Sequence, residues 1–308
     1  MLSLALAAVL SLSGQSETAV ALPAQPAPIL GTMLTPDGET RAAALIIAGS
    51  GPTDRNGNAP QLGLTAGSYR LLAEGLASHG IATVRYDKRG IGASFAAGVS
   101  ESELRFGMLV DDARAWAAET ARLTGKPCVW LIGHSEGSLI ALAAAQDNET
   151  VCGVVSLSGA GRSAPVVLRE QLQAGVPEPL LGQALHAIDE LVAGRMTDNV
   201  PGLESLFRPS VQPYIISWFA LDPQVLANLY DGPLFVGHGS TDFQTRVADA
   251  EALKAAQPDA TLVIWEGVNH VLKTAPTDRA ANAATYGDPT LPLAPGVVED
   301  VADFILTR

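Results

Sequence analysis

The segment Gly133-His134-Ser135-Glu136-Gly137 places a serine between two glycines, in the pattern G-x-S-x-G. An apolar run typical of a strand precedes it, and an Ala-rich run typical of a helix follows it. This strand–turn–helix context predicts a tight turn that exposes the Ser135 hydroxyl and directs the Glu136 backbone N–H toward developing negative charge. A serine that only caps the helix is the alternative interpretation. We favour a nucleophile, with Gly133 and Gly137 shaping the turn.

A serine hydroxyl needs a base that removes its proton and a third group that orients the base. Among the five histidines, His270 in WEGVNHVLK follows the last predicted strand, on the side of the sheet where α/β proteins build their sites. Asp242 in LFVGHGSTDFQT follows the preceding strand. Alone, Asp242 could stabilise a turn and His270 could be a solvated loop residue. Together with Ser135 they give the order Ser, Asp, His, which predicts a catalytic triad.

A second amide that stabilises an oxyanion is expected from the turn in AALIIAGSGPTDRNGN, where Gly49-Ser50-Gly51 lets the backbone approach a substrate carbonyl. We choose the Ser50 N–H, with Gly51 as the second choice. A phosphate-binding loop is the competing interpretation, but the G-K-[ST] ending is missing. Asp54 and Arg55 could form a local ion pair that fixes this loop, or could contact substrate.

Short apolar runs alternate with helical patterns along the chain, which is typical of parallel βαβ units. The predicted strands are 43–48, 81–86, 128–132, 151–157, 234–236 and 261–265, with an antiparallel edge at 18–22 and 29–34. The predicted helices are 69–79, 105–124, 137–145 and 248–256. Because the strands lack polar alternation, we expect both faces of the sheet to be covered. The fold class is therefore α/β, with a mostly parallel, doubly wound sheet.

Residues 162–230 interrupt this alternation with a long helical stretch broken by prolines, which we interpret as an inserted helical cap. The cap holds five of the chain's 16 aromatic residues: Phe207, Tyr214, Trp218, Phe219 and Tyr230. Aromatic side chains commonly line ligand pockets, so the first four are candidate substrate-binding residues. A small cap also needs such side chains for its own core, and both interpretations stay open.

Composition narrows the classes of function. The net charge of −13, with no basic stretch, makes nucleic acid an unfavourable partner. No apolar run approaches the roughly 18 residues of a membrane-spanning helix. Cys128 and Cys152 match no metal or redox spacing, and they are either a disulfide or two buried apolar side chains. We expect no metal site, and the sequence does not indicate an oligomeric state.

The apolar run at 2–12, followed by small and polar residues, predicts a signal peptide at 1–16, although the usual basic start is missing. The remaining residues 17–308 then form one catalytic domain interrupted by the cap. Export would place the protein outside the cell or in the periplasm. The alternative is a cytoplasmic protein with an N-terminal tail.

The segments GHSEGS, AGSGPTDRNGN, RYDKRGIGAS, GSTDFQ and VNHVLK together resemble the α/β-hydrolase superfamily. More narrowly, they are similar to bacterial serine esterases with a GSGPTDR-type oxyanion loop, in which Asp is common where this chain has Asn56. The resemblance implies the catalytic roles given above for Ser135, Asp242 and His270, and the amides of Ser50 and Glu136 as the oxyanion hole.

The same resemblance extends to the turn after the predicted strand 81–86. Asp87, Arg89, Gly90 and Gly92 match the corresponding turn of many superfamily members. We expect them to support the scaffold, with a pocket-lining Asp87 as the alternative.

The implied reaction is hydrolysis of a small-molecule carboxylic ester through an acyl-enzyme, without a metal or organic cofactor. A serine peptidase or amidase of the same fold is the main alternative. A non-catalytic binding protein on this scaffold is the third interpretation, because one fold hosts many functions.

Overall fold

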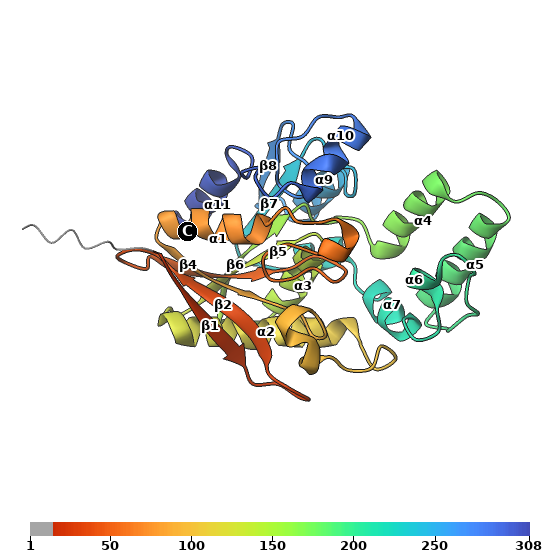
Figure 1. Ribbon diagram of the computed structural model, residues 1–308, viewed down its shortest axis with the longest axis horizontal. Coiled ribbons are helices and arrows are strands. Elements are labelled where there is room, and N and C mark those ends of the chain that lie inside the picture. Colours follow the sequence, from red (N-terminus) through yellow and green to blue (C-terminus); the bar gives the residue numbers. More distant parts are fainter. Residues whose placement is uncertain (1–14) are drawn as a thin grey trace, which may run out of the picture.

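Within residues 15–308, the part of the chain that the computed structural model describes, eight strands form one sheet in the order β1-β2-β4-β3-β5-β6-β7-β8 (Figure 1). The strands are β1 (Ser16–Leu22), β2 (Ile29–Thr35), β3 (Ala42–Ile47), β4 (Ile81–Tyr86), β5 (Val129–His134), β6 (Val151–Leu157), β7 (Leu234–Gly239) and β8 (Thr261–Trp265). Strand β2 runs antiparallel to both of its neighbours, and the other neighbouring pairs are parallel. The predicted mostly parallel sheet with an antiparallel edge is confirmed.

Helices cover both faces of the sheet, as the apolar strands require. Helices α1 (Ser68–Ser78) and α11 (Val297–Leu306) pack on one face. Helices α2 (Phe106–Thr124), α3 (Glu136–Ala145) and α9 (Val247–Ala256) pack on the other. Every residue of α3 from Gly137 onward is buried, which explains why its sequence is apolar on all sides.

Five helices connect β6 to β7, where a simple βαβ unit would need one. They are α4 (Ala164–Gly175), α5 (Leu180–Val192), α6 (Glu204–Phe207), α7 (Gln212–Phe219) and α8 (Pro223–Leu229). Helices α4 to α7 stand beside the sheet and have a core of their own (Figure 1). Helix α8 belongs to the body, because Ala227 is fully buried in the core that α2, α3 and α9 share. The cap is thus shorter than the expected 162–230.

Several short elements were not predicted from the sequence. They are α10 (Arg279–Ala284) and the 3-10 helices η1 (Pro60–Leu62), η2 (Gly92–Ala97) and η3 (Thr285–Gly287). The longer helix α11 was not predicted either. The 3-10 segments are too short to show a hydrophobic period. Helix α11 does have an apolar face, formed by Val297, Val301, Phe304 and Ile305, and could have been found by its spacing.

A disulfide joins Cys128, just before β5, to Cys152 in β6, with the two Cα atoms 5.2 Å apart. The sequence left open a disulfide or two buried apolar side chains, and the structure has the disulfide. The predicted leader at 1–16 lies outside the described residues except for its last two, and Ser16 begins β1. None of the helices described between residues 15 and 308 has the length and apolar character needed to cross a bilayer.

Candidate active site

Ser135 occupies a strained turn between β5 and α3. Its φ of 54° and ψ of −121° lie in a region that non-glycine residues rarely adopt. The turn packs so tightly that a Cβ added to Gly133 would lie 2.1 Å from the Gly137 carbonyl oxygen, and one added to Gly137 would lie 2.3 Å from that of Ile47. Both glycines are therefore required by close backbone approach. This geometry lifts the Ser135 side chain out of the sheet at the end of β5.

The Ser135 side chain opens into a cavity of about 680 Å³ between the cap and the body. Ser50, Gly51 and Glu136 line the same cavity. These three are the residues predicted to supply the oxyanion amides, and the fold brings them together with Ser135. Within residues 15–308, neither the Ser50 nor the Gly51 N–H donates a hydrogen bond. The Glu136 N–H lies in the first turn of α3, where a helix leaves its amides free. These amides are available to an oxyanion.

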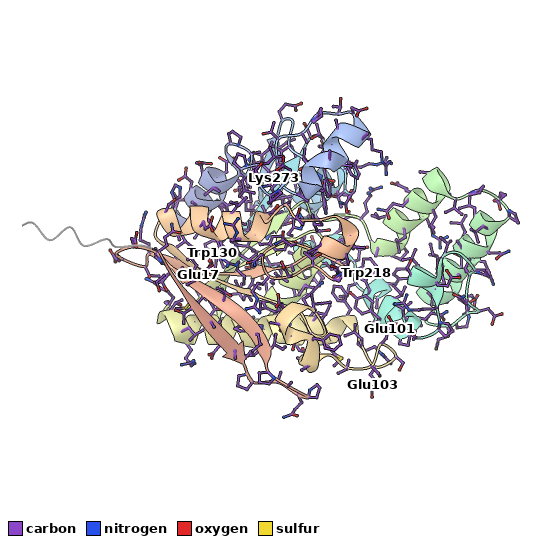
Figure 2. The ribbon with its side chains drawn as sticks, in the orientation of Figure 1. Glu17, Glu101, Glu103, Trp130, Trp218 and Lys273 are labelled. Atoms are coloured by element: carbon purple, nitrogen blue, oxygen red, sulfur yellow. A yellow bond between two sulfur atoms is a disulfide. The ribbon has the colours of Figure 1, made fainter. Side chains whose placement is uncertain are left out.

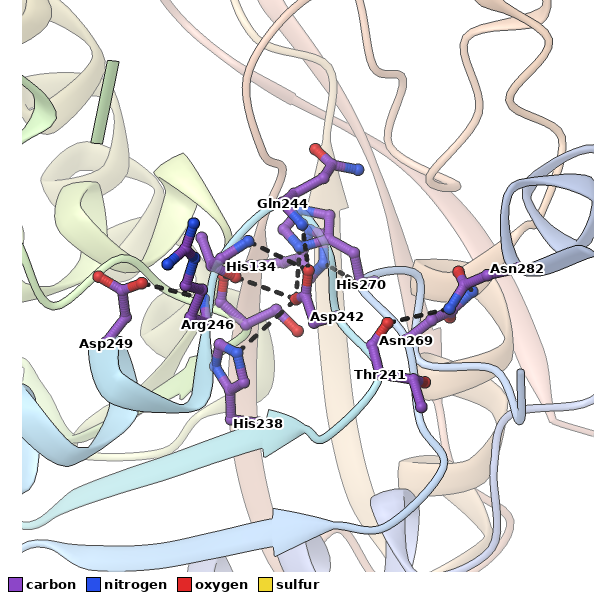
Figure 3. A network of polar contacts seen from close by, with 12 residues as sticks. His134, His238, Thr241, Asp242, Gln244, Arg246, Asp249, Asn269, His270 and Asn282 are labelled. Carbon is purple, nitrogen blue, oxygen red and sulfur yellow. Dashed lines mark hydrogen bonds and ion pairs between the residues drawn. The ribbon is translucent and has the colours of Figure 1, made fainter. Parts of the chain in front are cut away.

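Asp242 and His270 form a hydrogen-bonded pair, with 2.7 Å between Asp242 Oδ2 and His270 Nδ1 (Figure 3). Asp242 follows β7 and His270 follows β8, so the parallel strands deliver both side chains to one sheet edge. Because an ionised carboxylate only accepts, Nδ1 carries the proton and Nε2 is left as the basic atom. The His270 ring centroid lies 4.8 Å from that of His134, the residue before Ser135. The acid–base pair and the serine turn therefore share the same end of the sheet.

The Asp242 carboxylate is held from both sides and is fully buried. Oδ1 accepts hydrogen bonds from the backbone N–H groups of Gln244 (2.8 Å) and Thr245 (3.1 Å), and Oδ2 also accepts one from the Thr245 hydroxyl (2.9 Å). Burial acts to raise the pKa of Asp242, but the charge and hydrogen bond of His270 and these further contacts outweigh it, so the pKa is lowered. Asp242 is ionised and can stabilise a protonated His270.

A second histidine, His238 at the end of β7, also approaches Asp242. Its Nε2 lies 3.9 Å from Asp242 Oδ2, beyond hydrogen-bond distance, and its side chain is fully buried. Burial is the main cause that lowers the pKa of His238. Because His270 hydrogen-bonds to Asp242 and His238 does not, the geometry favours His270 as the partner of this carboxylate.

His134 links the backbone of His270 to the serine turn. Its Nε2–H donates to the His270 backbone carbonyl (2.7 Å), and its Nδ1 accepts from the Tyr69 hydroxyl (2.8 Å). The Tyr69 oxygen in turn accepts from the Gly49 N–H (3.0 Å). Burial, followed by the charge of His270, lowers the pKa of His134 to about 3, so the ring stays neutral and keeps this pattern. In the G-x-S-x-G pattern His134 stands at a variable position, and no sequence motif indicated a role for Tyr69.

Two asparagines support the loops that carry Asp242 and His270, and no sequence pattern indicated either of them. The Asn269 amide donates to Asn282 Oδ1 (3.1 Å) and to the Thr285 hydroxyl (2.7 Å). The Asn282 amide donates to the carbonyls of Thr241 (2.9 Å) and Pro276 (3.0 Å) (Figure 3). Asn282 on α10 therefore links the loop that carries Asp242 to the loop that carries His270.

The expected ion pair between Asp54 and Arg55 does not form. Arg55 instead pairs with Asp87 at 2.7 Å, and Asp54 accepts from the backbone N–H groups of Asn56 and Asn58. An adjacent pair cannot meet here because the Asp54 carboxylate is used inside its own turn. Asp87 also accepts from the Ala93 N–H (2.8 Å), which joins the oxyanion loop to the turn after β4. Asp87 is buried and does not line the cavity, as expected of a scaffold residue.

Of the four candidate aromatic residues of the cap, two line the cavity and two belong to the core of the cap. Tyr214 and Trp218 line the cavity, and Trp218 lies where the cap meets the body (Figure 2). Phe207 is only 2% exposed and belongs to the cap's own core, against which Phe219 packs. Neither Phe207 nor Phe219 lines the cavity, because these side chains point to the interior of the four-helix cap. The fifth, Tyr230, is buried in the core of the body.

The cavity wall is largely aliphatic. Residues from the body include Ile91, Leu104, Leu109 and Leu139, and residues from the cap include Val167, Leu168, Leu206, Val211 and Ile215. Each charged side chain that lines it is paired with a residue of opposite charge. The pairs are Lys88–Glu136, Arg89–Asp112, Arg162–Asp249 and Arg208–Glu101. The cavity therefore presents an apolar surface whose charges are already compensated.

No group of three or more His, Cys, Asp or Glu side chains suited to a metal ion occurs among residues 15–308. The polar groups at this end of the sheet are the Ser135 hydroxyl, the His270–Asp242 pair and the backbone amides of Ser50, Gly51 and Glu136.

Comparison with known proteins finds one matching family and several solved structures with a similar fold. Residues 61–191 match the family described as serine aminopeptidase, S33. No curated protein matches the chain. The solved structure of Est1E from Butyrivibrio proteoclasticus with ferulic acid bound is similar, with a TM-score of 0.61 and 15% identity over 94% of this chain and 96% of that one.

Two further solved structures are similar to this chain. A dienelactone hydrolase from Anabaena variabilis has a TM-score of 0.56 and 17% identity, covering 96% of this chain and 98% of that one. The acylaminoacyl peptidase of Pyrococcus horikoshii has a TM-score of 0.54 and 13% identity, covering 88% of this chain and 40% of that one. Together with the strand order and the serine turn after β5, these likenesses show that the chain has the α/β-hydrolase fold.

Proposed function

We propose that this protein is a serine hydrolase that cleaves carboxylic esters through an acyl-enzyme. The observation that supports it most is the Asp242–His270 hydrogen bond of 2.7 Å at the sheet edge where Ser135 occupies its strained turn. The three residue types, their chain order and their places after β5, β7 and β8 are those that nucleophilic catalysis on this fold requires.

In the proposed mechanism, His270 Nε2 removes the Ser135 proton as Oγ attacks the ester carbonyl carbon. The amides of Glu136 and Ser50, or Gly51 in place of Ser50, hold the resulting oxyanion. His270 then gives its proton to the leaving alcohol, and an acyl group stays on Ser135. Water, deprotonated by His270, attacks this acyl group, and the carboxylic acid leaves as the serine regains its proton. Asp242 stabilises the protonated His270 in both halves.

The cavity favours an uncharged ester with an apolar acyl or alcohol group. Its aliphatic wall would gain from burying apolar substrate surface, at about 25 cal/mol per Å². Its charged residues are engaged with one another, so a charged substrate would have to break an existing pair to gain one. We therefore expect neutral, medium-sized esters to be turned over faster than esters that carry an ionised carboxylate or amine.

A serine peptidase is the second candidate, because the matched family is described as a serine aminopeptidase. An aminopeptidase must bind the free, positively charged amino group of its substrate. The carboxylates in the cavity are those of Glu101 and Glu136, and each is already paired with a cation, Arg208 and Lys88 respectively. This pairing favours an ester over a free amino-terminal residue.

The decisive experiment is covalent labelling with an alkyl fluorophosphonate, followed by mass spectrometry of the labelled peptide. We expect one label on Ser135 in the wild type and none in Ser135→Ala, with the same melting temperature for both. A native protein that is not labelled beside a reactive control esterase would contradict the proposal and support a non-catalytic binding protein. Rates on 4-nitrophenyl acyl esters and on aminoacyl 4-nitroanilides then distinguish an esterase from a peptidase.

We also propose that the protein works outside the reducing cytoplasm. The Cys128–Cys152 disulfide supports this location, because such bonds persist in oxidising compartments. When the protein is denatured without reductant and then alkylated, no free thiol should be found. Two alkylated cysteines in protein isolated from its own host would contradict the proposal.

A further inference from the structure

Lys88 lies directly after β4, and its buried ammonium group reaches the predicted oxyanion loop. Its side chain is 6% exposed and lines the cavity together with Ser50 and Glu136. Nζ donates to the Gly49 carbonyl oxygen at 2.6 Å and to Glu136 Oε2 at 3.0 Å. The scaffold role expected for the neighbouring residues Asp87 and Arg89 does not account for these contacts. A buried ammonium carries a desolvation cost, so its partners are informative.

The Gly49 carbonyl matters because it shares one planar peptide unit with the Ser50 N–H. In a trans peptide these two groups point in opposite directions. An ammonium that holds the carbonyl on one side therefore fixes the N–H on the other. Ser50 lines the cavity, and its N–H has no partner within residues 15–308. A positive charge on the carbonyl also polarises the peptide and strengthens its N–H as a donor.

The Gly49 backbone is held at its other polar group as well. Its N–H donates to the Tyr69 hydroxyl at 3.0 Å. The residue is buried against the serine turn, since a Cβ added to Gly49 would lie 3.1 Å from the Ser135 Cβ. Two side chains from different elements, Tyr69 on α1 and Lys88 after β4, thus set the orientation of this segment beside the nucleophile.

The same ammonium contacts the residue that supplies the other predicted amide. The Glu136 carboxylate is 5% exposed and accepts from Lys88 and, at 2.7 Å, from the Tyr214 hydroxyl of the cap. One cation therefore joins the loop after β3 to the start of α3, the two segments whose N–H groups must converge on one oxygen atom.

We propose that Lys88 is a positioning residue that orients the Gly49–Ser50 peptide and thereby assembles the oxyanion hole. The catalytic part of this inference rests on the proposed function, whereas the orientation of the peptide can be measured without substrate. Lys88 acts through the backbone and does not itself exchange a proton with substrate.

The test is Lys88→Met, which keeps an unbranched stem and removes the ammonium. Losing an oxyanion donor costs about 10²–10³-fold in kcat, so a misoriented donor should lower kcat by about 10- to 100-fold. KM should change by less than about threefold, because the oxyanion forms only in the transition state. The residual dipolar coupling of the Ser50 N–H bond, measured by NMR in the absence of substrate, should change, because it reports the orientation of this bond. Lys254→Met is the matched control, since the Lys254 ammonium also binds two backbone carbonyls, but at the far end of α9.

A double variant separates positioning from charge compensation. Lys88→Met leaves the Glu136 carboxylate without its cation, whereas Lys88→Met with Glu136→Gln leaves no unpaired charge and removes that cause of misfolding. If Lys88 orients the peptide, the double variant stays slow and Glu136→Gln alone is faster than it. A double variant with wild-type kcat, or a Ser50 N–H dipolar coupling unchanged by Lys88→Met, would overturn the inference. Wild-type labelling by the fluorophosphonate decides the proposed function separately, so the two can fail independently.

Discussion

Asp242→Asn is the substitution that tests the acid–base pair most directly. The two backbone N–H groups that contact Oδ1 can be satisfied only by an acceptor, so the carbonyl oxygen of the new asparagine must stay there. The amide NH₂ then occupies the place of Oδ2 and faces His270 Nδ1. Two donors would meet, and His270 can avoid this only by moving its proton from Nδ1 to Nε2. The base then presents a proton to the serine instead of a lone pair.

The expected loss in kcat is about 10⁴-fold, the size seen when the same change is made in a serine protease triad. That factor corresponds to about 5.4 kcal/mol of transition-state stabilisation. KM should change little, because the cavity wall is untouched. The fold should survive, since the asparagine has the same shape and keeps both backbone hydrogen bonds.

Steady-state hydrolysis of a 4-nitrophenyl ester, with active sites counted by the fluorophosphonate, measures this loss. Asp222→Asn is the matched control, because Asp222 caps α8 and asparagine is an equally good capping residue. A kcat for Asp242→Asn within tenfold of the wild type, at an unchanged melting temperature, would refute the assignment. It would then point to His238 or to a different acid.

The disulfide, the glycine after the serine turn and the buried His134 each bear on stability. Replacing both Cys128 and Cys152 by serine should lower the free energy of unfolding by about 3.5 kcal/mol, the loop entropy for a separation of 24 residues, and an unchanged urea midpoint would contradict this. Gly137→Ala should abolish folding or activity because its Cβ would lie 2.3 Å from a backbone oxygen of β3, whereas Gly107→Ala in open space should fold normally, as circular dichroism would show. Burial and then the charge of His270 lower the pKa of His134 from 6.5 to about 3, so the unfolded chain binds a proton that the folded chain does not. Its stabilisation is therefore present above pH 6.5 and is lost toward pH 3, by about 1.4 kcal/mol per pH unit, and a His134→Gln variant with the wild-type slope in urea titrations would speak against it.

Much of the fold was predictable because its determinants are local. Buried parallel strands must be continuously apolar, so the strands β3 to β7 could each be predicted from a short run of residues. The serine turn was predictable for a related reason, since Gly133 and Gly137 are demanded by backbone contacts within a few residues of Ser135. The order of the strands along the chain then left few places for an acid and a base.

The rest depends on contacts between segments that are distant in sequence. Lys88 reaches Gly49 across 39 residues, and Tyr69 reaches His134 across 65, and no periodic pattern records either contact. The division of the cap aromatics had a similar cause. Phe207 and Trp218 are both large aromatic residues, and the packing of α5, α6 and α7 decides which one faces the cavity.

Because the charged side chains of the cavity are already paired with one another or with neighbouring residues, the cavity should retain the acid product of the reaction only weakly. Ester hydrolysis converts an uncharged substrate into a carboxylate, so the product carries a charge that the substrate lacked. Lys88, Arg89 and Arg162 already have anionic partners and offer the new carboxylate no vacant cation. The surrounding protein, with its net charge of −13, repels an anion as well. We therefore expect product to leave readily, with millimolar concentrations of the free acid causing little inhibition.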